Sequence, residues 1–236
     1  MKFSVIQPSY LPWRGYFHQI QKADVFVFYD DVQFDKHGWR NRNRIKGPRG
    51  SEWITIPVLS KSNVSQGLAI KDVRINPSDK RWRRKHWSMI SQYYGKSEFF
   101  GETSQVVAPF LENPYELLAD LTVDLTVAIA RKLGIQTEFH RSSDLALSGD
   151  RNERLIAMAK HFGATHYISG PSAAAYLDEA AFGRAGIDVE FMTYDYPEYP
   201  QPFPPFDPQV SILDLLFAVG PRAGEFIWHD GSTSVS

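Results

Sequence analysis

The chain has 236 residues, of which 43% are hydrophobic and 22% are charged, and these values are ordinary for a globular protein of one large domain or a domain with a subdomain. A formal net charge of -1 gives the molecule as a whole no reason to bind nucleic acid or an anionic membrane. The absence of cysteine excludes thiol catalysis, disulfides and Cys-ligated metals, and fits a reducing compartment, so we expect a cytoplasmic protein.

The N-terminus runs directly into the strand-like residues 3–6 without a cationic lead, which predicts no signal peptide. No apolar run approaches the roughly 20 residues of a transmembrane helix, so we expect no membrane span. We expect residues 1–220 to form a single α/β domain and residues 221–236 to form a C-terminal tail. Residues from about 36 to 100, rich in tryptophan and basic side chains, could form a subdomain within it.

The first thirty residues predict a strand over 3–6, a helix over 14–23 and a second strand over 25–29. A strand, helix and strand within about 30 residues form a βαβ unit with parallel strands. The loops that follow the two strands should therefore open together at the carboxyl edge of the sheet, where α/β proteins bind ligands.

The rest of the chain alternates in the same way, so we expect an α/β fold with a mainly parallel sheet flanked by helices, Rossmann-like in class. Predicted strands cover 52–58, 70–75, 166–169 and 189–193. Predicted helices cover 78–94, a segment from Asn113-Pro114 to Gly134, a segment from the capping box at Asp150 to Gly163, residues 173–176 and residues 212–218.

The loop from Gln7 to Trp13 is longer, and carries more polar and aromatic side chains, than a strand-to-helix connection needs. Gln7, Ser9 and Tyr10 supply neutral hydrogen-bonding groups, two prolines stiffen the turn, and Gly15 would let the backbone approach a ligand closely. The alternative is an ordinary connection with aromatic packing.

The same loop has the outline of the nucleotidyltransferase-superfamily motif, in which His-x-Gly-His at a helix start binds phosphates. Trp13-Arg14-Gly15-Tyr16 stand at those positions. The glycine is kept and both histidines are absent, so adenylyl transfer by that histidine pair is excluded.

Asp30 and Asp31 directly follow the second strand and should point to opposite sides. One could enter the cleft as a general base or as an acceptor for sugar hydroxyls or an amine. The alternative is a pair that initiates a turn. The pair supplies too few ligands for a metal ion, and no metal site is predicted.

Residues 36–46 are cationic without one acid, and they alternate arginine with asparagine. If this part is extended, the arginines share one side, where they could bind a local anion such as a diphosphate. The alternative is a solvated edge. The candidates are His37 for proton transfer and, for binding, Trp39, Arg40, Asn41, Arg42 and Asn43.

A second basic-aromatic run covers residues 80–87. On a helix, Trp82 and His86 share one face, so one side of the run can pack while another meets phosphate. We name Arg84 and His86 as candidate binding residues, although a lone histidine is more often structural.

Ser169-Gly170-Pro171-Ser172 follows a predicted strand and opens a predicted helix, which in principle makes an anion site from backbone N–H groups. Ser169 and Gly170 are the candidates, and an unliganded helix cap is the alternative. Tyr194 and the aromatic residues after it could form a wall beside this site or simply cover a sheet edge.

Three long motifs carry a family resemblance: Gln-Pro-Ser-Tyr-Leu-Pro-Trp-Arg-Gly-Tyr-Phe from Gln7, Tyr-Asp-Asp-Val-Gln from Tyr29, and Trp-Arg-Asn-Arg-Asn from Trp39. Tyr-Ile-Ser-Gly-Pro-Ser-Ala from Tyr167 and Ser-Ile-Leu-Asp-Leu-Leu-Phe from Ser211 extend it. On these residues, from about 3 to 220, the chain resembles the WbqC-like family.

The resemblance implies a transferase of O-antigen or other surface-polysaccharide biosynthesis, which attaches glycine or another aminoacyl group to the amine of a sugar-nucleotide-linked amino sugar. A sugar nucleotide is the implied partner, and its diphosphate would meet Arg40, Arg42 and Arg84. The activated donor stays open among a thioester, an acyl adenylate and an aminoacyl-tRNA; a tRNA is compatible but not required, and no cofactor is indicated.

Two other functions remain open at the level of sequence. The chain could bind a sugar nucleotide or glycan without chemistry, as a partner of a glycan-assembly enzyme. It could also be a degenerate nucleotidyltransferase, which would bind a nucleoside triphosphate with Mg²⁺.

Overall fold

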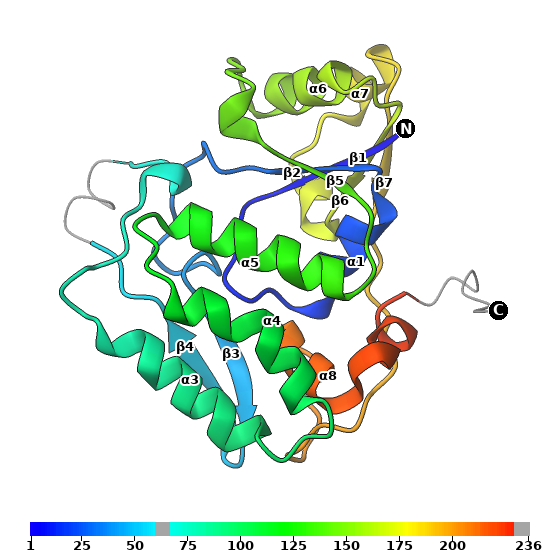
Figure 1. Ribbon diagram of the computed structural model, residues 1–236. Coiled ribbons are helices and arrows are strands. Elements are labelled where there is room, and N and C mark those ends of the chain that lie inside the picture. Colours follow the sequence, from blue (N-terminus) through cyan, green and yellow to red (C-terminus); the bar gives the residue numbers. More distant parts are fainter. Residues whose placement is uncertain (60–66, 229–236) are drawn as a thin grey trace.

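The computed structural model describes residues 1–59 and 67–228, and its centre is a five-stranded parallel sheet in the order β5-β2-β1-β6-β7 (Figure 1). The strands are β1 (Lys2–Ile6), β2 (Val25–Phe28), β5 (Glu138–Arg141), β6 (His166–Ser169) and β7 (Asp188–Phe191). The predicted α/β, Rossmann-like fold with its parallel sheet is confirmed.

The chain first builds the sheet in one direction, from β1 to β2 to β5, and then crosses to the other side of β1 for β6 and β7. The reversal places a topological switch point between β1 and β6, which pair from Lys2 with His166 to Ser4 with Ile168. In open α/β sheets, ligands bind outside the carboxyl ends of the strands at such a point.

Both faces of the sheet are covered, which explains why β2 is hydrophobic at every position and fully buried. Phe26 and Phe28 belong to the core with α1 (Arg14–Lys22) and α5 (Leu118–Lys132). Val25 and Val27 face the opposite core, with α6 (Arg151–His161) and α7 (Glu179–Arg184); Figure 1 shows these two helices on the other side of the sheet.

A second, smaller sheet is the antiparallel ribbon of β3 (Arg42–Gly47) and β4 (Gly50–Thr55). It shares the larger core with α3 (Arg81–Tyr94), α4 (Phe100–Glu112) and α8 (Ile212–Val219). The predicted helices over 78–94 and 212–218 and the strand over 52–58 are present with shifted ends. The sequence analysis assigns no element to residues 100–112, where α4 forms with Pro109 inside it.

Three local predictions are wrong. Within the strand expected over 70–75, residues Ile70–Asp72 form the 3-10 turn η1. Among the described residues, Arg74 and Ile75 form isolated bridges to Leu117 and Val58, so this segment belongs to no continuous strand ladder. Asn113 ends α4 instead of starting a helix, and α5 begins only after Leu117, whose extended backbone bridges Arg74. The helix expected over 173–176 is the 3-10 turn η3 (Pro171–Ala175).

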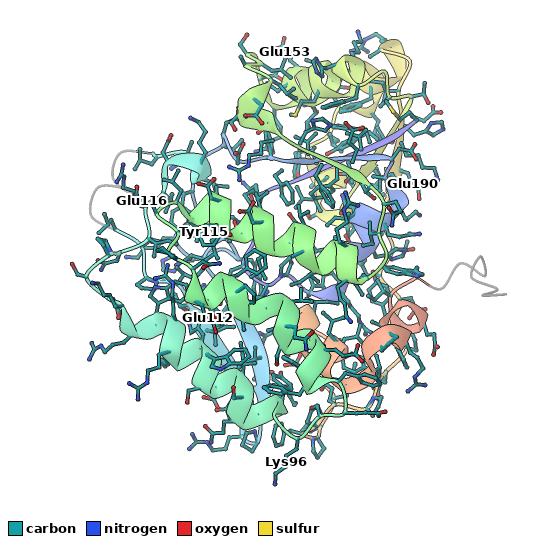
Figure 2. All side chains as sticks on the ribbon, viewed as in Figure 1. Lys96, Glu112, Tyr115, Glu116, Glu153 and Glu190 are labelled. Atoms are coloured by element: carbon teal, nitrogen blue, oxygen red, sulfur yellow. The ribbon has the colours of Figure 1, made fainter. Side chains whose placement is uncertain are left out.

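The predicted capping box at the start of α6 is confirmed. The Glu153 amide donates to Asp150 Oδ1 at 2.9 Å, and the Asp150 amide donates to Glu153 Oε2 at 2.8 Å. Glu153, in the first turn of α6, lies at the outer end of the molecule (Figure 2). Together the two bonds satisfy orphan amides of the first turn and fix where the helix begins.

The fold continues past the expected boundary at Gly220, through the 3-10 segment η4 (Gly220–Phe226). Ala223 and Ile227 are buried in the larger core, so the C-terminal residues up to 228 are packed. A further short turn, η2 (Ser142–Asp144), follows β5. In the two described ranges, no helix has the length and apolar character needed to cross a bilayer.

Candidate functional site

A cleft of about 840 Å³ lies at the topological switch point of the sheet. Gln7, directly after β1, and Ser169 with Gly170, at the end of β6, form its floor together with side chains of α1 and of the first turn of α6. The loops that the sequence placed at the carboxyl edge of the sheet therefore do meet in one cavity.

The lining is positively charged. Arg40, Arg151 and Arg154 contribute to it, and among the described residues no aspartate or glutamate does. An anionic ligand would therefore meet guanidinium groups without competing carboxylates on the wall.

The three arginines differ in the contacts that their guanidinium groups make within the protein. Arg40 donates from Nη1 to the carbonyl oxygens of Gln7 at 3.1 Å and Pro8 at 3.4 Å, and its Nε lies 3.4 Å from Asp35. Burial lowers the pKa of the Arg40 guanidinium, while Asp35 opposes that change. Arg40 therefore has two roles: it holds the first loop in place through hydrogen bonds, and it adds positive charge to the cleft.

Arg154 donates to the Asp31 carboxylate, and both side chains are only 16% exposed, so this pair is partly shielded from water. Arg151, by contrast, is exposed at the mouth of the cleft, and its guanidinium lies 4.3 Å from the centre of the Tyr176 ring. Contact with a ring face leaves the N–H groups of the guanidinium free to donate hydrogen bonds. Arg151 is therefore the cation best placed to bind an incoming anion.

Aromatic side chains also line the cleft. Trp13 contacts the edge of Tyr194 with ring centroids 4.9 Å apart, and the Tyr194 hydroxyl donates to Gln19 Oε1 at 3.2 Å. Burial raises the pKa of Tyr194 to about 12, so it remains a neutral donor near pH 7. Flat apolar faces beside such donors suit a base or a sugar ring.

The sequence suggests that Gly15 lets the backbone approach a ligand, but the structure gives this glycine a different role. A Cβ at this position would lie 2.3 Å from Cζ2 of Trp13, so the missing side chain makes room for the indole and not for a ligand. This glycine therefore acts through the tryptophan that lines the cleft.

Seven of the predicted site residues meet in this cleft: Gln7, Trp39, Arg40, Asn43, Ser169, Gly170 and Tyr194. Asn43 helps to form it, because its amide donates to the carbonyl oxygens of Tyr10 at 3.1 Å and Leu11 at 2.7 Å and so fixes the first loop.

The remaining predicted residues lie outside the lining: Tyr10, Asp30, Asp31, His37, Asn41, Arg42, Arg84 and His86. Tyr10 and His86 are buried against each other, with the Tyr10 hydroxyl 3.0 Å from His86 Nδ1. Tyr10 therefore packs in the core, whereas His86 lines a separate, second cleft. His37 and Arg84 are exposed elsewhere, and Asn41 donates to the Ile56 carbonyl at 2.8 Å. Arg42 lies over Trp53.

Asp30 is fully buried and accepts hydrogen bonds from the amide and hydroxyl of Ser143, each at 3.0 Å. These contacts tie β2 to the turn after β5. A carboxylate enclosed in this way has no access to substrate, which corrects the prediction that it acts as a general base.

The predicted anion site after β6 lacks the α-helix that the sequence analysis expected there. Since η3 is a 3-10 turn of five residues, the helix-dipole argument does not apply there. Ser169 is buried, with its hydroxyl 3.3 Å from that of Tyr167, so the backbone turn is what this segment offers the cleft.

The sequence interpretation missed Arg151 and Arg154. The capping box predicts where the helix starts, and it also places two arginines three residues apart on one face of the first turn. Their contribution follows from the topology, because α6 begins at the same edge of the sheet. Among the described residues, no group of three or more histidines, cysteines or carboxylates is placed to hold a metal ion.

The fold and the cleft define an α/β protein with an arginine-and-aromatic cleft at the switch point of a parallel sheet. The family model of the WbqC-like protein family matches residues 7–226, and the chain belongs to this family. It is 41% identical over 228 residues to the uncharacterized protein Rv1507c of Mycobacterium tuberculosis, with 96% of this chain and 97% of that protein aligned. No solved structure is significantly similar.

Proposed function

We propose that this protein binds a sugar nucleotide in the cleft and transfers glycine or another aminoacyl group to the amine of its sugar, in the biosynthesis of a surface polysaccharide such as O-antigen. The observation that carries the binding is a wall with three arginines and, among the described residues, no carboxylate. The transfer itself is supported by the family resemblance alone.

The size and chemistry of the cleft support a ligand of this kind. Its volume of about 840 Å³ lies within the roughly 300–1,000 Å³ of small-molecule sites. We place the diphosphate beside Arg151 and Arg154, and the base and sugar rings against Trp13 and Trp39. The arginines would then bind the charged groups of the ligand, and the tryptophans would bind its rings.

The proposed reaction forms a C–N bond between the sugar amine and the acyl carbonyl and breaks the bond from that carbonyl to its carrier. The amine must be neutral to attack, and its proton passes to the released carrier atom. Of the predicted acid–base residues, Asp31 lies against the lining, through Arg154, and is the one we propose for this transfer. Orientation of the two substrates in the cleft would lower the activation barrier further.

A second candidate function, binding without transfer, is favoured by one observation. Among the described residues, the lining contains neither a carboxylate nor a histidine, which are the usual general bases. In that case the protein would hold the sugar nucleotide for a partner enzyme.

A mass measurement separates the two functions. The protein is incubated with a UDP- or dTDP-linked amino sugar and with glycyl thioester, glycyl adenylate or glycyl-tRNA, and we expect a glycyl-sized increase in the mass of the sugar nucleotide. The product should fall at least about tenfold in Arg151→Ala, which loses a charged hydrogen bond, and in Asp31→Asn.

The matched control is Lys160→Ala, which removes an exposed cation from the same helix without touching the cleft. Saturable binding without product for all three donors would contradict transfer and support the binding function.

A further inference from the structure

At one side of the cleft, two tryptophans are exposed beside each other: Trp39 lines the cleft and Trp53 lies outside its lining. Trp39 is 42% exposed and Trp53 is 44% exposed, and their rings lie 5.3 Å apart at an angle of 31°. Single exposed aromatic side chains are common, but a contiguous exposed patch of them is typical of an interaction site.

Arginines surround this pair because of the alternation along β3. Asn43 and Ile45 point inward and are buried, so Arg42 and Arg44 point outward. The Arg42 guanidinium lies 4.4 Å from the Trp53 ring centre, and that of Arg44 lies 5.9 Å from it. The outer face of the ribbon is therefore both cationic and aromatic.

A second cleft of about 500 Å³ adjoins this face. Trp53, Trp82, Arg81 and Lys85 line it. Among the described residues, Asp79 is the one acid in this lining, and it accepts a hydrogen bond from the Arg81 amide at 3.2 Å. The first turn of α3 holds no acid at all. Cations at a helix N-terminus oppose the helix dipole, so their presence here does not serve helix stability.

The two clefts are joined by the tryptophans. Trp39 lines the first cleft, Trp53 lines the second, and the two rings contact each other. A ligand that matches the whole path must be long, anionic along its backbone and provided with flat groups at intervals.

We propose that this path binds single-stranded nucleic acid, with bases on Trp39 and Trp53 and phosphates near Arg42, Arg44 and Arg81. A duplex would not suit it, because its bases are already stacked and paired. If the strand is RNA, its end in the first cleft could carry the aminoacyl group; that last assignment rests on the proposed function, whereas binding of the strand does not.

Fluorescence anisotropy with a labelled 12-nucleotide RNA, the DNA of the same sequence and an RNA hairpin tests this. We expect saturable binding of a single strand that weakens with salt, and Trp53→Ala should weaken it roughly 5- to 150-fold, the range for loss of one stacked base. Arg42→Ala and Arg44→Ala should each reduce the salt slope by about 0.7. The RNA and DNA arms distinguish which strand is preferred.

Arg184→Ala, which removes an exposed cation from α7, is the matched control and should bind like the wild type. Circular dichroism verifies folding, and the two arginine variants give a readout independent of Trp53. No saturable binding of either strand at 50 mM salt, equal binding of the hairpin, or equal affinity in all the variants would overturn the proposal. The assay contains no sugar nucleotide and no donor, so its result is separate from that of the transfer assay.

Discussion

Replacing Asp30 with alanine is expected to lower the free energy of unfolding by about 3 kcal/mol, because buried donors lose a charged acceptor. The carboxylate accepts from the amide and the hydroxyl of Ser143 at 3.0 Å each, and the Ser142 hydroxyl lies 3.2 Å from it. For a chain of this length, that loss corresponds to a melting temperature lower by roughly 6–12 °C. Urea unfolding measures it directly.

The matched control is Asp144→Ala, an exposed carboxylate in the same turn, for which we expect a change below about 0.5 kcal/mol. An Asp30→Ala protein as stable as the wild type but without transfer activity would contradict the structural role. It would restore Asp30 as a catalytic base.

A second large effect concerns the pH dependence of stability at Asp214. This residue is fully buried in α8 and accepts a hydrogen bond from the Tyr94 hydroxyl at 2.9 Å. Burial raises its pKa to about 6, compared with about 4 in an unfolded chain. The folded protein therefore binds more protons between these values, and its stability falls by about 3 kcal/mol as the pH rises from 4 to 6.

His86 has the opposite effect over almost the same range. Burial lowers its pKa to about 4, whereas an unfolded histidine has a pKa of about 6.5. The folded protein binds fewer protons between these values, so this group raises stability by about 3 kcal/mol as the pH increases from 4 to 6.5. The two contributions should nearly cancel in the wild type.

Variants separate the two groups, and the measurement is the free energy of unfolding by urea at several pH values between 4 and 6.5. Relative to the wild type, Asp214→Asn should gain about 3 kcal/mol of stability as the pH rises, and His86→Gln should lose a similar amount. Only the change with pH is compared, so a uniform loss of stability in either variant does not affect the result. Curves parallel to the wild type for both variants would contradict the assignment.

The general position of the site could be predicted from the sequence because it follows from topology. A βαβ unit forces the loops after β1 and β2 to the same edge, and a strand ending in Ser169 adds a third segment there. The alternation of Arg42 and Arg44 against Asn43 was also predictable, since it needs only an extended backbone.

The roles of individual side chains were not predictable, because they depend on contacts between distant segments. Tyr10 and His86 are 76 residues apart and become a buried pair. Asp30 is satisfied by a turn 113 residues later, and Arg151 enters the cleft from a helix that reads as an ordinary capped segment. Local patterns do not contain such pairings.

Isothermal titration calorimetry measures directly whether a UDP- or dTDP-linked amino sugar binds to the cleft. We expect one site, with an affinity reduced roughly 10- to 150-fold in Arg151→Ala and unchanged in Lys160→Ala, as loss of one charged hydrogen bond predicts. No saturable heat with either nucleotide, or an affinity in Arg151→Ala equal to that of the wild type, would contradict the assignment of this cleft.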